Sequence, residues 1–262
     1  MRCLVLASGS KGNCLYIEGG SGAVLVDAGL SYRETALRLA RAGGHLDRIQ
    51  AILVTHEHAD HLAGLDAVAG KLKVPVYGTG GTLSEYLRTR RTSKRFQVTE
   101  VCRFGEARQA GGFQVEALAT SHDALEPCGF IVRESDLSVA CCTDTGEVTP
   151  AMLEGFRRCD AVVLESNHCP VMLREGPYPE MLKRRIRSKR GHLSNHAAAA
   201  CLTALGKEVG AVMLAHLSQV NNTPGKARSS ACSGLGLFMN DVRVTVASQD
   251  GSTPESPQEI LL

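Results

Sequence analysis

The densest group of ionisable side chains in the sequence is the stretch 55–61, which reads THEHADH. Four of its side chains, His56, His58, Asp60 and His61, follow the order His-x-His-x-Asp-His. Imidazole nitrogen with carboxylate oxygen is the ligand mixture that zinc and manganese accept. His56 and His58 follow an apolar run and can point the same way in an extended chain, which suits one metal ion. Asp60 and His61 lie at the turn into a helix and suit a second ion close by. The spacing therefore predicts half of a two-metal site.

Other candidate side chains follow the ends of predicted strands along the whole chain. They are Asp27, His56, His122, Asp144, Glu165 and His216. A single histidine or aspartate is more often structural or solvated. Strand ends, however, meet at one edge of a sheet, so side chains placed there repeatedly are expected to converge on one site.

The elements that must position these residues are an alternation of apolar runs and helical patterns. We predict strands at 3–7, 15–18, 23–26, 49–54, 74–77, 113–119, 130–132, 138–142, 161–164, 211–214 and 243–247. We predict helices at 31–42, 62–72, 82–88, 150–158, 180–189 and 194–205. Length and an ordinary composition, 44% hydrophobic and 21% charged, favour one α/β domain over residues 1–250. Residues 251–262, rich in glycine and proline, are expected to form a loosely ordered tail.

The cysteines and the hydropathy bear on the location of the protein. The ten cysteines have no regular spacing, which is typical of small buried side chains in a reducing compartment. No apolar run approaches the roughly 18 residues of a membrane span, and the first residues lack a secretory pattern. We therefore expect a cytoplasmic protein without a membrane partner.

Basic residues form two clusters that hold 11 of the 29 lysines and arginines. The first cluster is Arg88, Arg90, Arg91, Lys94 and Arg95, and the second is Lys183, Arg184, Arg185, Arg187, Lys189 and Arg190. Such clusters indicate a polyanionic partner, although a solvated helix face has the same composition. Aromatic residues are only 4% of the chain, and tryptophan is absent, so a broad base-stacking surface is not expected.

A loop of glycine and small polar residues at 8–13 could bring backbone N–H groups close to an anion. We expect Ser8, Ser10, Lys11 and Asn13 to contact phosphate, with a plain hairpin turn as the alternative. Ser194 and Asn195 are further candidates for phosphate contacts. Asp27 could support a metal ligand from behind, or it could cap the following helix.

The ordered set of Asp27, His-x-His-x-Asp-His, His122, Asp144 and His216 resembles the metallo-β-lactamase fold superfamily over nearly the whole chain. The resemblance implies a four-layer αββα sandwich, classed as α/β (α+β), with the site at one edge of the paired sheets. It also implies one metal ion on His56, His58 and His122. A second ion would lie on Asp60, His61 and His216, and Asp144 would bridge both.

Within the superfamily, the sequence looks like the YycJ (WalJ) group, which is associated with exonuclease activity on DNA from the 5′ end. The segments that carry this resemblance are 6–13, 165–168, 191–195 and 214–218. The group usually has aspartate after the Asn-His pair, whereas this chain has Cys169, so any role of that acid is in doubt. Glu165 and His192 also resemble, more loosely, the carboxylate and proton-donating histidine of the ribonuclease Z branch. His168 is the rival proton donor.

The expected reaction is phosphodiester hydrolysis in nucleic acid, with 5′-to-3′ degradation of DNA as the leading form, by a hydroxide that bridges two zinc or manganese ions. Asp60 or Asp144 could orient that hydroxide. The main alternative is a hydrolase of a small substrate, such as a cyclic phosphodiester, a thioester of the glyoxalase II type or a lactam. A non-catalytic nucleic-acid-binding protein with structural metals is a further alternative. It is disfavoured because structural zinc sites are usually rich in thiolates, which this ligand set lacks.

Overall fold

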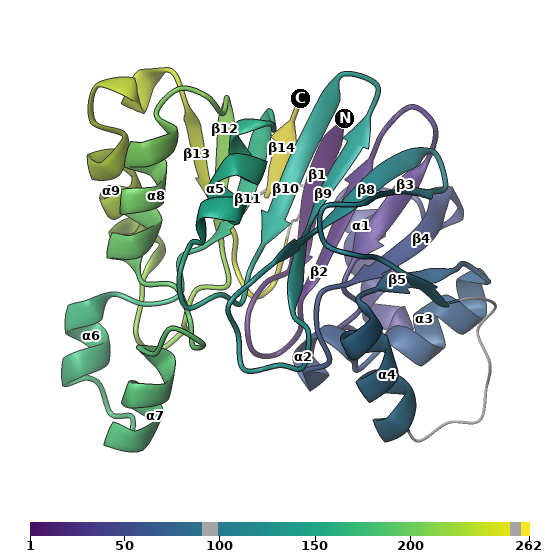
Figure 1. The fold of residues 1–262 in the computed structure, drawn as a ribbon, viewed down its shortest axis with the longest axis horizontal. Helices are drawn as coiled ribbons and strands as arrows, with labels where there is room; N and C mark the ends of the chain where they lie inside the picture. Colours follow the sequence, from purple (N-terminus) through teal and green to yellow (C-terminus); the bar gives the residue numbers. More distant parts are fainter. Residues whose placement is uncertain (91–98, 252–257) are drawn as a thin grey trace.

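The protein is two β-sheets packed face to face, with helices on both outer faces (Figure 1). The computed structural model describes residues 1–90, 99–251 and 258–262. Helices, sheet, sheet and helices form four layers, so the predicted αββα architecture is confirmed.

The first sheet contains seven strands in the order β14-β1-β2-β3-β4-β5-β6. Their bounds are β14 Glu259–Leu261, β1 Arg2–Ala7, β2 Cys14–Glu18, β3 Ala23–Val26, β4 Ile49–Val54, β5 Val76–Gly78 and β6 Thr99–Val101. Strands β3 to β6 run parallel to one another. Their carboxyl ends therefore lie along one edge of this sheet.

The second sheet has the order β13-β12-β11-β10-β9-β8-β7. Its strands are β13 Arg243–Val246, β12 Ala211–Ala215, β11 Ala161–Glu165, β10 Leu137–Cys142, β9 Cys128–Glu134, β8 Phe113–Ala119 and β7 Ala107–Ala110. Strands β10 to β13 are parallel, so this sheet also gathers several strand ends at one edge.

The helices divide between the two outer faces and one end of the molecule (Figure 1). The first sheet is accompanied by α1 Tyr32–Arg41, η1 Leu46–Arg48, α2 Ala59–Leu62, α3 Leu65–Leu72 and α4 Gly80–Thr89. The second sheet is covered by α5 Pro150–Arg157, α8 Asn195–Leu205 and α9 Pro224–Leu235, followed by η2 Gly236–Asn240. Helices α6 Pro170–Glu175 and α7 Glu180–Ile186 stand beyond the strand ends, at the lower left of Figure 1.

Apolar side chains fill three layers because the central parallel strands are buried on both faces. In β4, Leu53 packs between the sheets, whereas Ile52 and Val54 pack under the helices of the first sheet. In β11, Val163 enters the same central layer, and its neighbours pack under α5 and α8. The continuous apolar runs of the sequence are thus explained by burial on both sides.

The helix predicted at 62–72 is interrupted, and this is a correction. Leu62, where the predicted helix begins, is the last residue of α2, and α3 begins after Gly64. The Gly64 N–H donates to the Ala28 carbonyl, while the carbonyl of Asp60 accepts the N–H of Asn13. The hydrogen bond that would continue the helix is therefore replaced by bonds to the loops that follow β1 and β3.

Several other boundaries differ from the prediction. The basic helix expected at 180–189 ends at Ile186, where the His192 N–H donates to the Ile186 carbonyl. Helix α9 is missing from the prediction because its buried side chains include two alanines and one leucine, which give a weak helical pattern. The short elements α6, β6, β7 and β14 are also missing from the prediction.

The end of the chain is more ordered than expected at its last residues. Residues 252–257 lie outside the described part of the chain. Beyond them, β14 pairs antiparallel with β1, and Ile260 is buried in the central layer. Among the described residues, no helix is long and apolar enough to cross a lipid bilayer.

Candidate metal centre

The strand ends of both sheets deliver ionisable side chains to a common edge. The elements that carry them are β3, β4, β8, β10, β11 and β12, and the side chains are Asp27, His56, His122, Asp144, Glu165 and His216. Each of these residues is at most 4% exposed. The convergence expected from the sequence is therefore present in the structure.

Three of these residues adopt a backbone conformation that is uncommon for side chains other than glycine. The φ angles are 63° at Asp27, 55° at Asp144 and 55° at His216. Aspartate and histidine tolerate the left-handed region better than bulky residues do, but each such position costs about 1–3 kcal/mol. The direction of these side chains therefore depends on strained turns that the surrounding fold maintains.

The first group of potential ligands is His56, His58 and His122, whose ligand atoms lie within 4.8 Å of one another. His56 Nε2 is 3.1 Å from His58 Nδ1. His122 Nδ1 donates to the Gly191 carbonyl over 2.9 Å, which leaves Nε2 as the nitrogen with a free lone pair. Three ring nitrogens can thus face one cation.

The second group is Asp60, His61 and His216, whose ligand atoms also lie within 4.8 Å of one another. Asp60 Oδ2 is 3.6 Å from His61 Nε2 and 4.0 Å from His216 Nε2. The side-chain amide of Asn13 lies beside this group, 3.1 Å from Asp60 Oδ2. This group has the mixed nitrogen and oxygen character predicted for it.

Asp144 lies between the two groups. Its Oδ2 is 3.3 Å from His61 Nε2, and its Oδ1 is 3.8 Å from His122 Nε2. Burial alone would raise the pKa of Asp144, but the neighbouring His216 and His61 hold that pKa well below its ordinary value. An ionised carboxylate at this place can contact ions in both groups.

Unpartnered atoms at the centre show that a divalent cation fits these residues. The buried atoms Asp144 Oδ2 and His216 Nε2 accept no hydrogen bond from any described residue. Leaving such atoms without a partner costs about 1–3 kcal/mol or more for a charged group. A cation among the histidine nitrogens and carboxylate oxygens would satisfy them, and this donor set suits zinc or manganese.

Asp27 supports this centre from behind, as the sequence suggested. Its Oδ2 accepts a hydrogen bond from His61 Nδ1 at 2.7 Å, and its Oδ1 accepts the Thr55 N–H at 2.9 Å. Burial lowers the pKa of His61, yet Asp27 and Asp144 outweigh it and raise that pKa well above the usual value. The hydrogen bond to Asp27 fixes the ring so that Nε2 points into the centre.

Glu165 joins two imidazoles. Its Oε1 accepts from His192 Nδ1 at 2.9 Å and from His216 Nδ1 at 2.8 Å, while its Oε2 accepts the N–H groups of Thr145 and Leu193. Burial opposes the charge on His192, but Glu165 raises the pKa of His192 to about 9. All of these bonds engage Glu165, so its geometry is that of an orienting group.

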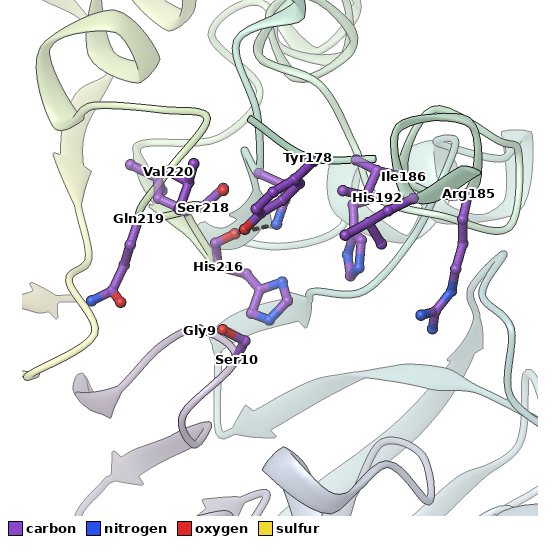
Figure 2. A pocket seen from close by; sticks show the side chains of 13 residues that line it. Gly9, Ser10, Tyr178, Arg185, Ile186, His192, His216, Ser218, Gln219 and Val220 are labelled. Atoms are coloured by element: carbon purple, nitrogen blue, oxygen red, sulfur yellow. Dashed lines mark hydrogen bonds between the residues drawn. The ribbon is translucent and has the colours of Figure 1, made fainter. Parts of the chain in front are cut away.

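The two candidate proton donors have different surroundings. The His192 side chain is 21% exposed and lines a pocket beside His216 (Figure 2). His168 is 3% exposed, and burial lowers the pKa of His168 to about 4. A neutral, enclosed His168 is a poor donor at neutral pH, so these contacts favour His192.

Side chains of the loop at 8–13 make hydrogen bonds inside the protein, next to the metal centre. The Ser8 hydroxyl accepts the N–H of His216 at 2.7 Å, and Asn13 Oδ1 accepts the N–H of Gly9 at 2.8 Å. Both side chains are buried, and the phosphate contacts expected for Ser8 and Asn13 stay predictions. Ser10 lines the pocket, and Lys11 is exposed, so these two stay candidates for phosphate.

Ser194 and Asn195 make hydrogen bonds to protein groups, and the phosphate contacts expected for them stay predictions. The Ser194 hydroxyl caps α8 by accepting the Ala197 N–H at 3.1 Å. The Asn195 side chain is 1% exposed and bonds to Ser166 and Asn222. A phosphate at Asn195 would have to compete with these buried hydrogen bonds.

The basic clusters are less uniform than their sequence suggests. Arg91, Lys94 and Arg95 lie outside the described residues. Lys183 is buried and donates to the Arg174 carbonyl at 2.7 Å. Arg190 donates to the His122 carbonyl at 3.1 Å, which secures the loop carrying that histidine. Solvated positive charge is concentrated at Arg184, Arg185 and Lys189, whose side chains are 78%, 58% and 83% exposed.

Sequence reasoning missed two residues beside the centre. Asp123 Oδ1 lies 3.3 Å from His122 Nε2, and its Oδ2 accepts from Arg185 Nε at 2.7 Å. Its position directly after a candidate ligand was the available signal. Tyr178 lines the pocket next to His192 and His216, but no spacing in the sequence relates it to them. Cys169, in place of the acid usual in the YycJ group, is the N-cap of α6, and its side chain makes no capping bond there.

The geometry agrees with comparisons to known proteins. The family model described as "Beta-lactamase superfamily domain" matches residues 23–217. The chain belongs to the metallo-β-lactamase fold superfamily. It is 39% identical to "Exodeoxyribonuclease YycJ" of Bacillus anthracis over 86% of each chain. It is 34% identical to "Exodeoxyribonuclease WalJ" of Streptococcus pneumoniae over 95% of each. The predicted membership in this superfamily, with YycJ and WalJ as relatives, is confirmed.

Solved structures show the same fold at low sequence identity. The metallo-β-lactamase fold protein YhfI of Bacillus subtilis is 15% identical, with a TM-score of 0.71 over 99% of both chains. Zinc-bound PqqB of Methylobacterium extorquens is 16% identical, with a TM-score of 0.73 over 100% of both chains. The family match, the relatives named exodeoxyribonucleases and the His/Asp cluster identify the protein as a metal-dependent hydrolase that binds divalent metal.

Proposed function

We propose that this metallo-β-lactamase-fold protein is a two-metal nuclease, a DNA exonuclease that removes nucleotides from the 5′ end. The observation that carries the proposal is the placement of Asp144 between two groups of three potential ligands, beside a helix with exposed basic side chains. The relatives named exodeoxyribonucleases support DNA as the substrate. The seven proposed ligands are His56, His58, His122, Asp144, Asp60, His61 and His216.

The proposed chemistry divides between the metals and the chain. Two bound zinc or manganese ions would supply hydroxide at neutral pH and neutralise charge on the attacked phosphate. His192, oriented by Glu165 through Nδ1, donates a proton from Nε2 to the leaving oxygen. Asp60, in contact with Asn13, helps to align the attacking group. His192 thus acts at the leaving oxygen of the phosphodiester, and Asp60 acts at the attacking oxygen.

The basic residues near α7 are proposed to hold the nucleic acid by its phosphates. Arg184, Arg185 and Lys189 are exposed, although each lies within 3.9 Å of a carboxylate, and Arg185 also lines the pocket. Contacts of this kind are independent of base sequence, and they weaken at higher salt because the release of counterions is then less favourable. We therefore expect strong salt dependence and little sequence preference.

The decisive experiment is hydrolysis of end-labelled DNA and RNA strands by the metal-loaded protein and by His58→Ala. We expect stepwise release of nucleotides from the 5′ end of DNA and background activity for the variant. His45→Ala is a matched control, because His45 is exposed and its backbone, but not its ring, contacts Tyr16. Undiminished activity in metal-free protein would refute the two-metal mechanism.

The same assay separates the small-substrate alternative. A protein that hydrolyses bis(p-nitrophenyl) phosphate, a thioester or a lactam but leaves every DNA strand intact is not a nuclease. Labelling each end in turn determines the direction of degradation. Elemental analysis of the purified protein gives the number and identity of the metals.

We also propose that the protein acts in the cytoplasm. All ten cysteines are free, and eight of them are buried. Cys3 and Cys141 contact each other and stay unlinked, which suits a reducing compartment. Fractionation of cells that produce the protein tests this location.

A further inference from the structure

A pocket of about 240 Å³ opens directly beside the metal centre (Figure 2). Four parts of the sequence line it: Gly9 and Ser10, Asn167, five residues of the segment from Tyr178 to His192, and residues 216–220. His192 and His216 belong both to this pocket and to the hydrogen-bonded group around Glu165. A group bound here would therefore lie next to the proposed reaction.

The walls of the pocket differ in chemistry. One part is apolar and contains Leu182, Ile186 and Val220, with the ring of Tyr178 beside them. Figure 2 shows the Tyr178 ring and the side chains of His216 and Ser10 around the same space. The volume is below the range of about 300–1,000 Å³ that is usual for sites of drug-sized molecules. The pocket thus suits one flat ring, with an apolar face and polar edges.

An anchored arginine stands at the side of this pocket. Arg185 Nε donates to Asp123 Oδ2 at 2.7 Å, and no other described residue bonds to its guanidinium. Its terminal NH₂ groups are therefore free to make a paired contact with phosphate oxygens. Asp123 also lies 3.3 Å from His122 Nε2, which holds Arg185 close to the histidine groups. A ring in the pocket and a phosphate at Arg185 are the two parts of one nucleotide.

We propose that the pocket receives the base of the terminal nucleotide of the DNA strand, stacked on Tyr178, while Arg185 binds phosphate of that nucleotide. This inference rests on the proposed nuclease function and identifies how that site takes up its substrate. An end base is the favoured occupant because unstacking costs least where a base is already unpaired or frayed. A single aromatic contact also gives little base preference, since every base has a face that can stack.

The test changes the substrate before it changes the protein. Single DNA strands are prepared with a normal or an abasic terminal nucleotide, at the 5′ end in one set and at the 3′ end in another. We expect the abasic residue at the end that is degraded to raise KM by about 5- to 150-fold, the range of stacking on one aromatic side chain. Anisotropy of labelled strands with metal-free protein in EDTA should show a loss of affinity in the same direction.

Substitutions at one residue then locate the effect. Tyr178→Ala should bind normal and abasic ends equally, and Tyr178→Phe should keep the preference for a base because it keeps the ring. Arg185→Ala should weaken both kinds of end by a similar factor. Thermal melting of each variant checks its fold, and the abasic substrates test the wild-type protein without any substitution.

The outcomes separate this inference from the proposed function. Equal KM values for normal and abasic ends with wild-type protein would overturn the pocket assignment alone. Hydrolysis of bis(p-nitrophenyl) phosphate without cleavage of any DNA would overturn the nuclease proposal and the assignment with it. A preference for a base that persists in Tyr178→Ala would place the base outside this pocket.

Discussion

The side chains of the metal centre are buried, whereas the basic side chains around α7 are exposed to solvent. At the centre, the side chains of His61, Asp144 and His216 are 0%, 3% and 5% exposed, and buried hydrogen bonds fix the rings of His61 and His216. Around α7, Arg184 and Lys189 are 78% and 83% exposed. Long, solvated side chains can follow a flexible polyanion, whereas bond-making geometry needs fixed atoms. Rigidity and adaptability are thus separated over a short distance.

The largest effect is expected from Asp144→Asn, in the buried metal centre. The amide keeps the shape of the side chain but loses the charge that faces both ligand groups, so hydrolysis should fall to background. Metal content per chain, measured by mass spectrometry, should fall as well. Asp241→Asn, at the C-terminal cap of η2, serves as the control. Full activity and full metal content in Asp144→Asn would contradict the bridging role.

His192→Ala tests the boundary between the rigid centre and the open pocket. Loss of a positioned proton donor should lower kcat by about 10²- to 10⁴-fold on DNA. The loss should be much smaller on bis(p-nitrophenyl) phosphate, whose leaving group needs no proton. An equal loss on both substrates would indicate a structural role for His192. His168→Ala, tested in parallel, should retain the ratio of the two activities.

Asp27→Asn tests whether the hydrogen bonds that Asp27 accepts at its strand end matter for metal binding. Asparagine accepts the same left-handed backbone, so the change acts mainly on the hydrogen bonds to His61 and Thr55. We expect metal affinity to fall by about 10- to 100-fold, the usual effect of removing a group that orients a ligand. Titration with a competing chelator measures it. An unchanged affinity would show that the turn alone positions His61.

The smallest effect per residue is expected on the exposed side. Arg184→Glu combined with Lys189→Glu should weaken DNA binding and reduce its salt dependence, with a slope change of about 0.7 on single strands for each phosphate that these side chains neutralise. Hydrolysis of bis(p-nitrophenyl) phosphate should be unaffected. Arg228→Glu combined with Lys226→Glu, both exposed on α9, is the control with the same change in net charge. Equal effects in this control would argue against a local phosphate track.

The fold was largely predictable because burial on both faces leaves a plain signal in the sequence. The runs at β4 and β11 are continuous and apolar, and each ends in the residues that the site uses. Helix ends were less predictable, since hydrogen bonds to distant loops decide them. Gly64 interrupts the helix after the motif only because the carbonyl of Ala28 lies within 2.8 Å of its N–H.

The sequence by itself determined the ligand types, their order and their places at strand ends. His56, His58, Asp60 and His61 are close in sequence, so local geometry suffices to group them. Only the tertiary structure decided which polar residues work inside the protein. Ser8 and Asn195 face the interior because they satisfy buried backbone and amide groups, which no spacing reveals.

The pocket proposed for the substrate was the feature that depended most on tertiary structure. Tyr178, which precedes α7, and Arg185, which lies on α7, line the same pocket as His216 although they are far from it in the sequence. The sequence around Tyr178 and Arg185 has the composition of an ordinary solvated helix. Four candidate ligands are therefore grouped by a short motif, whereas the pocket proposed for the substrate depends on long-range packing, because a pocket exists only where separate segments meet.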